Sequence, residues 1–190
     1  MFSACIIVGE NTDGLGATLG ALVPAVADGV LRDAVIVDFS ADPDVELVCD
    51  AAGCGRVVAK ASLPLEKVGT SLRCEWLLLM MAGAVPQSGW HWSASEFIER
   101  AAMTVSPETV AAAFDYANPG FGKRDRMSEL WRRISGHLLG RVAPGQGLIL
   151  HRSHASPGSG FELGPQGWHK PPVAARVTVL PVTMTVPVPG

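Results

Sequence analysis

Short apolar runs that alternate with helix-like stretches are the feature of this sequence that most constrains its fold. Residues 3–8, 33–38 and 76–80 form such runs, each as long as one buried strand and shorter than a typical buried helix. Between the first two runs, leucine and valine recur at helical spacing from Leu15 to Val26, and Pro24 is expected to kink or shorten that helix. Buried strands that alternate with helices indicate a parallel sheet flanked by helices.

The first half of the chain continues this alternation. We expect a helix over 42–52 with Pro43 in its first turn, a third strand over 56–59, and a weaker helix over 64–73 before the strand at 76–80. Ligands of doubly wound sheets bind at the carboxyl ends of the strands. Four positions at these ends are therefore candidates for a site: Gly9–Asn11, Asp38–Ser40, Lys60 and Met81–Ala84.

The second half of the chain is less regular, and the whole of 1–190 is expected to form a single α/β domain. The expected elements are helices over 94–103 and 123–139 and strands over 110–116, 148–151 and 177–188. Residues 153–172 are rich in Gly, Pro, Ser and His and are expected to form a loop. Pro181 and Pro187 restrict the last strand to a sheet edge, because proline cannot donate a ladder hydrogen bond.

Composition and charge exclude two classes of protein. Apolar residues make up 48% of the chain and charged residues 17%, which excludes a disordered chain. A formal net charge of −3 argues against a general nucleic-acid binder. Residues 1–100 contain 13 acidic and 6 basic side chains, whereas the rest contain 5 acidic and 9 basic. Much of this basic excess lies in Lys123–Leu139, either a solvated helix face or a surface for a membrane or protein partner.

Cysteine usage and hydropathy indicate a compartment. The four cysteines contain no Cys-x-x-Cys pair, so we expect buried free thiols rather than disulfides or a zinc site. The apolar part of residues 76–95 is too short to span a bilayer, and the first residues carry no basic signal-peptide start. These features favour a cytoplasmic protein, with peripheral attachment at the inner face of the membrane as an alternative.

Common catalytic and cofactor motifs are absent from the sequence. Gly9, Gly14 and Gly16 do not have the spacing of a dinucleotide fingerprint, and neither a P-loop nor a Gly-x-Ser-x-Gly elbow occurs. His151 and His154 lack a third ligand at a metal-binding spacing. The pair of tryptophans at 90 and 92 either closes the core or stacks on a sugar or base.

Six segments, taken in order, carry a resemblance to a known family. They are Ile6–Asn11, Leu15–Leu19, Ala34–Asp42, Arg73–Leu79, Pro86–Trp90 and the stretch from Gly140 to Arg152 with its Gln146-Gly147-Leu148 strand entry. From Phe2 to Phe161 the chain resembles family 2 glycosyltransferases, which use nucleotide sugars. The resemblance implies a GT-A fold, that is, a Rossmann-like, mostly parallel sheet flanked by helices with an irregular C-terminal part.

The resemblance also implies where a nucleotide sugar would bind. Residues 1–92 would form the nucleotide-binding half and residues 93–190 the acceptor-side half. Nucleotide contacts would come from Glu10, Asn11, Asp38 and Lys60, with Arg141 and Arg152 as partners for a diphosphate. Two of these have plain structural alternatives, because Asp38 could instead cap the next helix and Lys60 could be an ordinary surface lysine.

The chain departs from the family where the chemistry of transfer is carried out. The family has an acidic, cation-binding motif after the strand that ends here at Met80, whereas this chain continues Met81-Ala82-Gly83-Ala84. The acid of the family's Gly-Asp-Gln strand is replaced by Gly145. Glu162 is the only local candidate for the general base, with a solvated loop glutamate as its alternative. We therefore expect no metal site and no cofactor.

Three functions are compatible with these residues. The first is a family 2-like protein that binds a nucleotide sugar, UDP or GDP with lost or weak catalysis. The second is an active, metal-independent glycosyltransferase in which basic side chains replace the cation. The third is a non-enzymatic scaffold that uses Lys123–Leu139 on a membrane or a partner protein. The sequence alone does not decide whether the protein is an enzyme.

Overall fold

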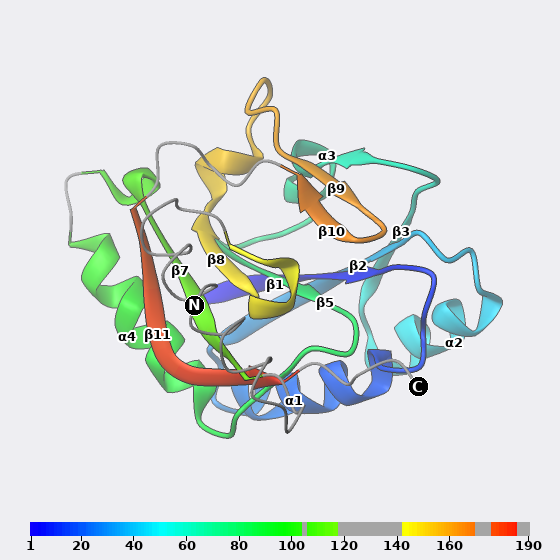
Figure 1. The fold of residues 1–190 in the computed structure, drawn as a ribbon, viewed down its shortest axis with the longest axis horizontal. Helices are drawn as coiled ribbons and strands as arrows, with labels where there is room; N and C mark the ends of the chain where they lie inside the picture. The colour runs from blue at the N-terminus through cyan, green and yellow to red at the C-terminus, as the bar shows by residue number, and fades with distance from the viewer. Residues whose placement is uncertain (104–105, 118–141, 170–175, 186–190) are drawn as a thin grey trace, which may run out of the picture.

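The computed structural model describes residues 1–103, 106–117, 142–169 and 176–185. Its α-helices are α1 (Leu15–Ala27), α2 (Pro43–Ala52), α3 (Leu65–Gly69) and α4 (Trp90–Ala102), and its short 3-10 turns are η1 (Pro107–Thr109), η2 (Pro144–Gln146) and η3 (Arg152–Ala155). Its strands are β1 (Phe2–Val8), β2 (Leu31–Asp38), β3 (Gly55–Val58), β4 (Leu63–Pro64), β5 (Trp76–Met81), β6 (Val85–Pro86), β7 (Val110–Ala117), β8 (Leu148–His151), β9 (Glu162–Gly164), β10 (Gly167–His169) and β11 (Arg176–Thr185). Figure 1 shows how these elements are arranged.

One eight-stranded sheet organises the fold, in the order β3-β2-β1-β5-β8-β7-β11-β6. The strands β3, β2, β1 and β5 are parallel to one another, which confirms the parallel sheet expected for the first half. The antiparallel strand β8 lies between β5 and β7, and β11 pairs with β7 in parallel. A smaller antiparallel sheet consists of β10, β9 and β4.

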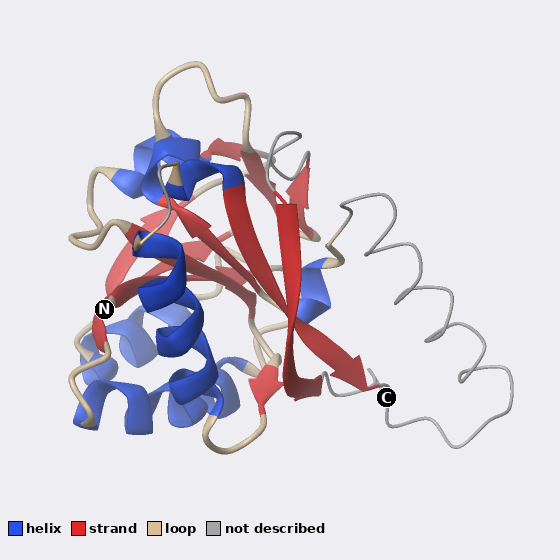
Figure 2. Cartoon of the chain, turned by 90° about the vertical axis from the view of Figure 1, so that its left-hand side faces the viewer, coloured by secondary structure: helices blue, strands red, loops and turns tan. Residues whose placement is uncertain are grey.

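The apolar runs are continuous because each central strand is buried on both faces. Along β5, Trp76, Leu78 and Met80 join the core beneath α1, α2 and α4, whereas Leu77 and Leu79 join a second core beneath α3 and the β9–β10 hairpin. This alternation follows from the two-residue repeat of a strand. In Figure 2 the helices and the sheet are seen as packed layers.

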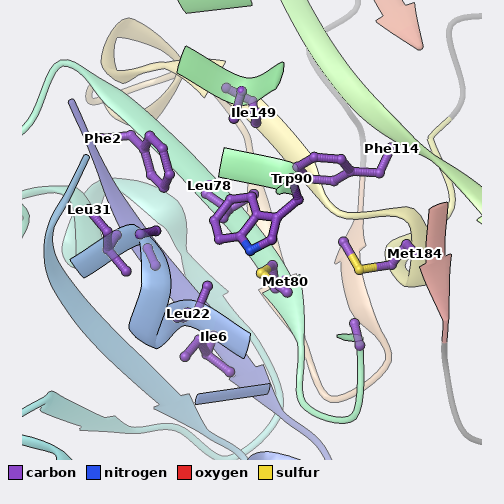
Figure 3. Packing of buried hydrophobic residues seen from close by; sticks show 14 of the residues in the cluster. Phe2, Ile6, Leu22, Leu31, Leu78, Met80, Trp90, Phe114, Ile149 and Met184 are labelled. Atoms are coloured by element: carbon purple, nitrogen blue, oxygen red, sulfur yellow. The ribbon is translucent and has the colours of Figure 1, made fainter. Parts of the chain in front are cut away.

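Trp90 lies at the centre of the first core (Figure 3). Its ring centroid is 5.7 Å from that of Phe2 and 5.9 Å from that of Phe114, and its indole N–H donates to the carbonyl of Ala21 at 3.0 Å. The core alternative is therefore confirmed for Trp90. Trp92 is 61% exposed and does not belong to this core.

The helices differ from the sequence prediction at their ends. Helix α1 continues through Pro24. Proline has no N–H to donate to the carbonyl of Gly20, four residues earlier, but Gly20 is exposed and its carbonyl can be hydrated instead. Helix α4 begins at Trp90, four residues earlier than predicted, because Gly89 takes a left-handed conformation with φ of 82° and starts it. Helix α3 covers only five residues of the predicted 64–73.

The C-terminal part corrects one prediction and refines another. Residues 153–172 were expected to form a loop, but β9 and β10 form a hairpin within them. Among the described residues, β11 pairs with β7 on one side and has a second partner, β6, only at Met184 and Thr185, so it is an edge strand around Pro181 and an inner strand at its end. Pro181 is tolerated because the register with β7 shifts between Leu180 and Thr183, which leaves it outside the ladder.

Other predictions concern thiols, membrane spans and the basic segment. All four cysteines are free, with Cys5 and Cys49 buried and Cys54 and Cys74 partly exposed. Within the described residues, no helix combines the length and the apolar character needed to cross a membrane. The predicted helix Lys123–Leu139 and the candidate Arg141 lie outside the described residues.

Candidate functional site

The carboxyl ends of four parallel strands meet at one edge of the main sheet. The register aligns Val8 with Asp38, Ile7 with Met81, and Asp38 with Val58. The loops that follow β1, β2, β3 and β5 therefore emerge side by side. This edge brings together the candidate residues Glu10, Asn11, Asp38 and Lys60 and the turn at 81–84.

Asp38 is the buried centre of this edge. Its side chain is fully buried, one oxygen accepts from the backbone N–H of Ser40 at 2.8 Å and from its hydroxyl at 2.6 Å, and the other accepts from Arg56. The Nε of Arg56 lies 3.1 Å and its Nη2 2.7 Å from that second oxygen. Arg56 also pairs with the exposed Glu46 at 2.7 Å. A buried carboxylate with a two-pronged guanidinium partner is strongly held in place.

These bonds determine the charge and the availability of Asp38. Burial alone would raise the pKa of Asp38, but the hydrogen bonds from Ser40 and Arg56 outweigh burial and hold that pKa below its ordinary value. The four bonds also use the roughly four lone-pair positions of a carboxylate. The helix-cap alternative does not apply to Asp38, since Asp42 caps α2 by accepting from the N–H of Asp44 at 2.9 Å.

The loops after β1 and β2 are linked to each other. The hydroxyl of Thr12 donates to Asp42 at 3.1 Å, and the side-chain oxygen of Asn11 accepts from the N–H of Asp13 at 2.9 Å. Glu10 and Asn11 are exposed at the surface of this edge, and Lys60 is exposed beyond the end of β3. Three of the four nucleotide candidates are therefore accessible, whereas Asp38 is not.

The turn after β5 occupies the position where the resemblance places acidic cation ligands. It is tied to α1 by the fully buried Thr18, whose hydroxyl accepts from the N–H of Gly83 at 2.9 Å and lies 3.0 Å from the carbonyl of Ala84. A Cβ built on Gly14 would collide with the backbone of Gly83. The turn thus packs directly on the start of α1, backbone against backbone.

The β9–β10 hairpin covers the end of β1. A Cβ on Gly9 would collide with the carbonyl oxygen of Pro165, the first residue of the hairpin turn. A Cβ on Gly167 would collide with the ring of Pro144 and would lie 3.4 Å from the sulfur of Met81. The hairpin turn therefore contacts the ends of β1 and β5, on the same edge as the candidate residues.

Two remaining candidates lie apart from this group. Arg152 follows β8, whose His151 is in register with Trp76 at the amino end of β5, so it lies about 20 Å from Asp38 along the strand direction. There its guanidinium donates to the carbonyl of Gly69 at 2.9 Å. Glu162 is an exposed residue of β9, in register with Pro64 and His169.

Sequence reasoning missed the residues that hold this edge together. Arg56 was not connected with Asp38, because the two residues are 18 positions apart and only the parallel pairing of β2 and β3 brings them together. Thr18 was passed over within an apolar helix, although a lone hydroxyl on its buried face was a signal for a specific partner.

Comparisons with protein-family models and with curated proteins found no match. Several solved structures are similar in fold. A mycobacterial protein aligns over all of this chain and 68% of its own, with 12% identity and a TM-score of 0.64. S. aureus TarS (residues 1–349), in complex with UDP-GlcNAc, aligns over all of this chain and 59% of its own, with 14% identity and a TM-score of 0.63.

A third similar structure is glucosyl-3-phosphoglycerate synthase from Mycobacterium tuberculosis, in complex with Mn²⁺, UDP and glucosyl-3-phosphoglycerate. It aligns over 80% of this chain and 57% of its own, with 12% identity and a TM-score of 0.54. The chain therefore spans between 57% and 68% of the length of these proteins. The likeness confirms the GT-A fold expected from the sequence.

The prediction of no divalent cation is contradicted by these comparisons. Structures of the M. tuberculosis synthase contain Mn²⁺ or Mg²⁺ together with UDP. The prediction was wrong because it considered only protein side chains, whereas Mg²⁺ is often held by few carboxylates together with substrate phosphates and water. In the described part of this chain, no three His, Cys, Asp or Glu side chains gather as a metal-binding group, so these residues alone do not fit such an ion.

Proposed function

We propose that this protein is a GT-A glycosyltransferase-like domain that binds a nucleotide sugar, or UDP or GDP, with lost or weak transfer activity. Residues 1–92 would supply the nucleotide side and residues 93–190 the acceptor side. The GT-A fold and the two UDP- or UDP-sugar-bound structures of similar fold support the ligand class.

The turn at 81–84 is the observation that carries the proposal of lost or weak transfer. Its side chains offer no carboxylate at the end of β5, and its backbone is fixed on α1 by Thr18 and Gly14. A cation that assists a diphosphate leaving group would thus lack carboxylate ligands from this turn.

The candidate base supports the same proposal. A general base must approach the acceptor hydroxyl to within hydrogen-bond distance. Glu162 is exposed on β9, while the next residue, Leu163, packs into the second core. We therefore expect Glu162→Gln to have little effect on any activity that is found.

Access to the edge should limit affinity. The turn of the hairpin lies against Gly9, and both oxygens of Asp38 are already occupied. A nucleotide would therefore bind through the exposed Glu10, Asn11 and Lys60, or would first displace the hairpin turn. Either route predicts weak binding, because the first offers only solvent-exposed partners and the second subtracts the displaced contacts from the affinity.

Isothermal titration calorimetry tests this proposal. UDP, GDP, UDP-glucose and UDP-GlcNAc are titrated into the full chain with Mn²⁺ or Mg²⁺ present, and release of UDP is followed in parallel. We expect binding that is weakened by Asn11→Ala or Lys60→Ala and not by Lys67→Ala, an exposed lysine on α3. Absence of binding by all four compounds, or rapid turnover of a donor, would overturn it.

The scaffold is a second candidate, based on the basic residues between Lys123 and Leu139. We propose it for a cytoplasmic protein attached peripherally to the inner face of the membrane, or bound to a partner protein. Sedimentation with anionic vesicles tests it, with Arg132→Glu plus Arg133→Glu as the charge-reversed variant. Equal sedimentation of the variant and the native chain would contradict it.

A further inference from the structure

A second concave surface lies at the opposite end of the sheet. A pocket of about 520 Å³ opens beside the amino end of β5 and the last turns of α4. It lies about 20 Å from Asp38 along the strand direction, so it is separate from the candidate site at the carboxyl ends of the strands. It is a shallow depression that is largely open to solvent.

The pocket has an apolar floor. Trp76 and Ile98 line it, and they are 4% and 5% exposed. The ring of Trp76 is fixed by two edge-on neighbours, Phe97 at 5.7 Å and His151 at 5.4 Å between ring centroids. Trp76 and Ile98 therefore form a buried base, and the accessible apolar surface of the pocket comes from Met1, which is 68% exposed, and from the exposed Ala102.

Two guanidinium groups line the same pocket. The side chain of Arg32 forms no hydrogen bond or ion pair with the residues that the structure describes. Arg73 is 78% exposed, and its Nε lies 4.0 Å from the nearest oxygen of Asp33, beyond hydrogen-bond distance. One lining residue, Glu75, is acidic. Both guanidinium groups therefore keep free donors for an anion.

We propose that this pocket binds a small organic anion with an apolar body, such as an aryl or alkyl phosphate or carboxylate. The anionic group would accept hydrogen bonds from Arg32 and Arg73, whose planar donors match phosphate and carboxylate oxygens. The apolar body would lie against Met1 and Ala102 and would reach the few exposed atoms of Trp76 and Ile98. The free thiol of Cys74 also lines the pocket and would be covered by such a ligand.

Three compounds separate the two parts of this recognition. Phenyl phosphate has both parts, inorganic phosphate has only the anion, and benzyl alcohol has only the apolar body. Calorimetry with the full chain should detect phenyl phosphate binding more tightly than either of the others. Equal affinity for phenyl phosphate and inorganic phosphate would overturn the proposal that the pocket binds an apolar body. Absence of phenyl phosphate binding at millimolar concentration would overturn the proposal that the pocket is a binding site.

Variants test the assigned residues. Arg32→Ala plus Arg73→Ala should weaken phenyl phosphate binding about tenfold or more, because charge-assisted hydrogen bonds are lost. The control is Arg100→Ala, which changes the charge of an exposed residue on α4 that does not line the pocket. An equal loss in this control would show a general charge effect and would overturn the assignment. Thermal unfolding and UDP titration of each variant show whether the fold and the other edge are intact.

The thiol gives an independent readout. Phenyl phosphate should slow the alkylation of Cys74 by iodoacetamide, located by mass spectrometry, and should leave the rate at Cys54 unchanged, since Cys54 lies near the end of α2. Unchanged alkylation of Cys74 at a saturating concentration would place the ligand elsewhere and would overturn the proposal.

Discussion

Replacing Thr18 by valine removes one oxygen from the molecule and leaves its shape nearly unchanged. The hydroxyl accepts from the N–H of Gly83 and donates to the carbonyl of Ala84 or, at 3.3 Å, to that of Gly14. Thr18 and Ala84 are fully buried and Gly83 is buried, so water is a poor substitute. The substitution therefore leaves one donor and one acceptor without partners at the end of β5.

The size of the effect follows from these two groups. An unsatisfied buried polar group costs about 1–3 kcal/mol, so Thr18→Val should lower the free energy of unfolding by about 3 kcal/mol. For a chain of this length that is a fall of about 9 °C in Tm. Helix propensity does not oppose the effect, because valine and threonine are nearly equal in that respect.

Thr18→Ser is the matched variant. It keeps the hydroxyl and loses only a methyl group, so it should cost about 1 kcal/mol. Urea unfolding followed by circular dichroism measures both free energies, and amide hydrogen exchange measures the protection of Gly83. Valine as stable as threonine, or serine less stable than valine, would refute the hydrogen-bond argument.

Three further predictions concern Asp38, two glycines and a thiol. Because the folded-state pKa of Asp38 is lowered, its carboxylate stabilises the fold above the ordinary aspartate pKa, and this contribution is lost as pH falls through the folded-state value. In urea unfolding, the stability difference between Asp38→Asn and the native chain should therefore be largest at pH 7 and should narrow as the pH falls below the ordinary aspartate pKa; a difference that does not change with pH would refute this. Gly9→Ala should lower Tm because its Cβ meets Pro165, whereas Gly20→Ala, with nothing within 4 Å on an exposed helix face, should raise it; the reverse order in a thermal scan would contradict the hairpin contact. Burial raises the pKa of Cys5 to about 12, so Cys5 should resist iodoacetamide at pH 8 until urea is added, and fast native labelling would be the contrary result.

The strands of the first half could be predicted because a strand that is buried on both faces is a continuous apolar run in the sequence. β5 is apolar at every position and β1 at every position except Ser3, since both faces of the sheet are covered, and this requires no knowledge of partners. The β9–β10 hairpin could not be predicted in the same way. Its strands have three residues each, and it is held by distant groups such as Gly9 and Pro144.

The candidate site was predictable in position and not in its contacts. Asn11 and Asp38 were expected at the carboxyl ends of the strands and lie there in the structure, because parallel strands share an orientation. That Asp38 is occupied by Arg56 depends on the pairing of β2 with β3, which no local pattern encodes. For Arg152 the predicted position itself was wrong. The strand β8 runs antiparallel to β5, so the residue that follows it lies at the far end of the sheet from Asp38.

The contact between Gly14 and Gly83 also limits how this sequence can change over time. Gly83 has φ of 89°, so any other residue there would be strained, and a side chain on Gly14 would meet the backbone of the turn. Ala82 has neither restriction, although it packs partly against the first core. An acidic residue after β5 would therefore be less costly at Ala82 than at Gly83, unless the start of α1 moves first.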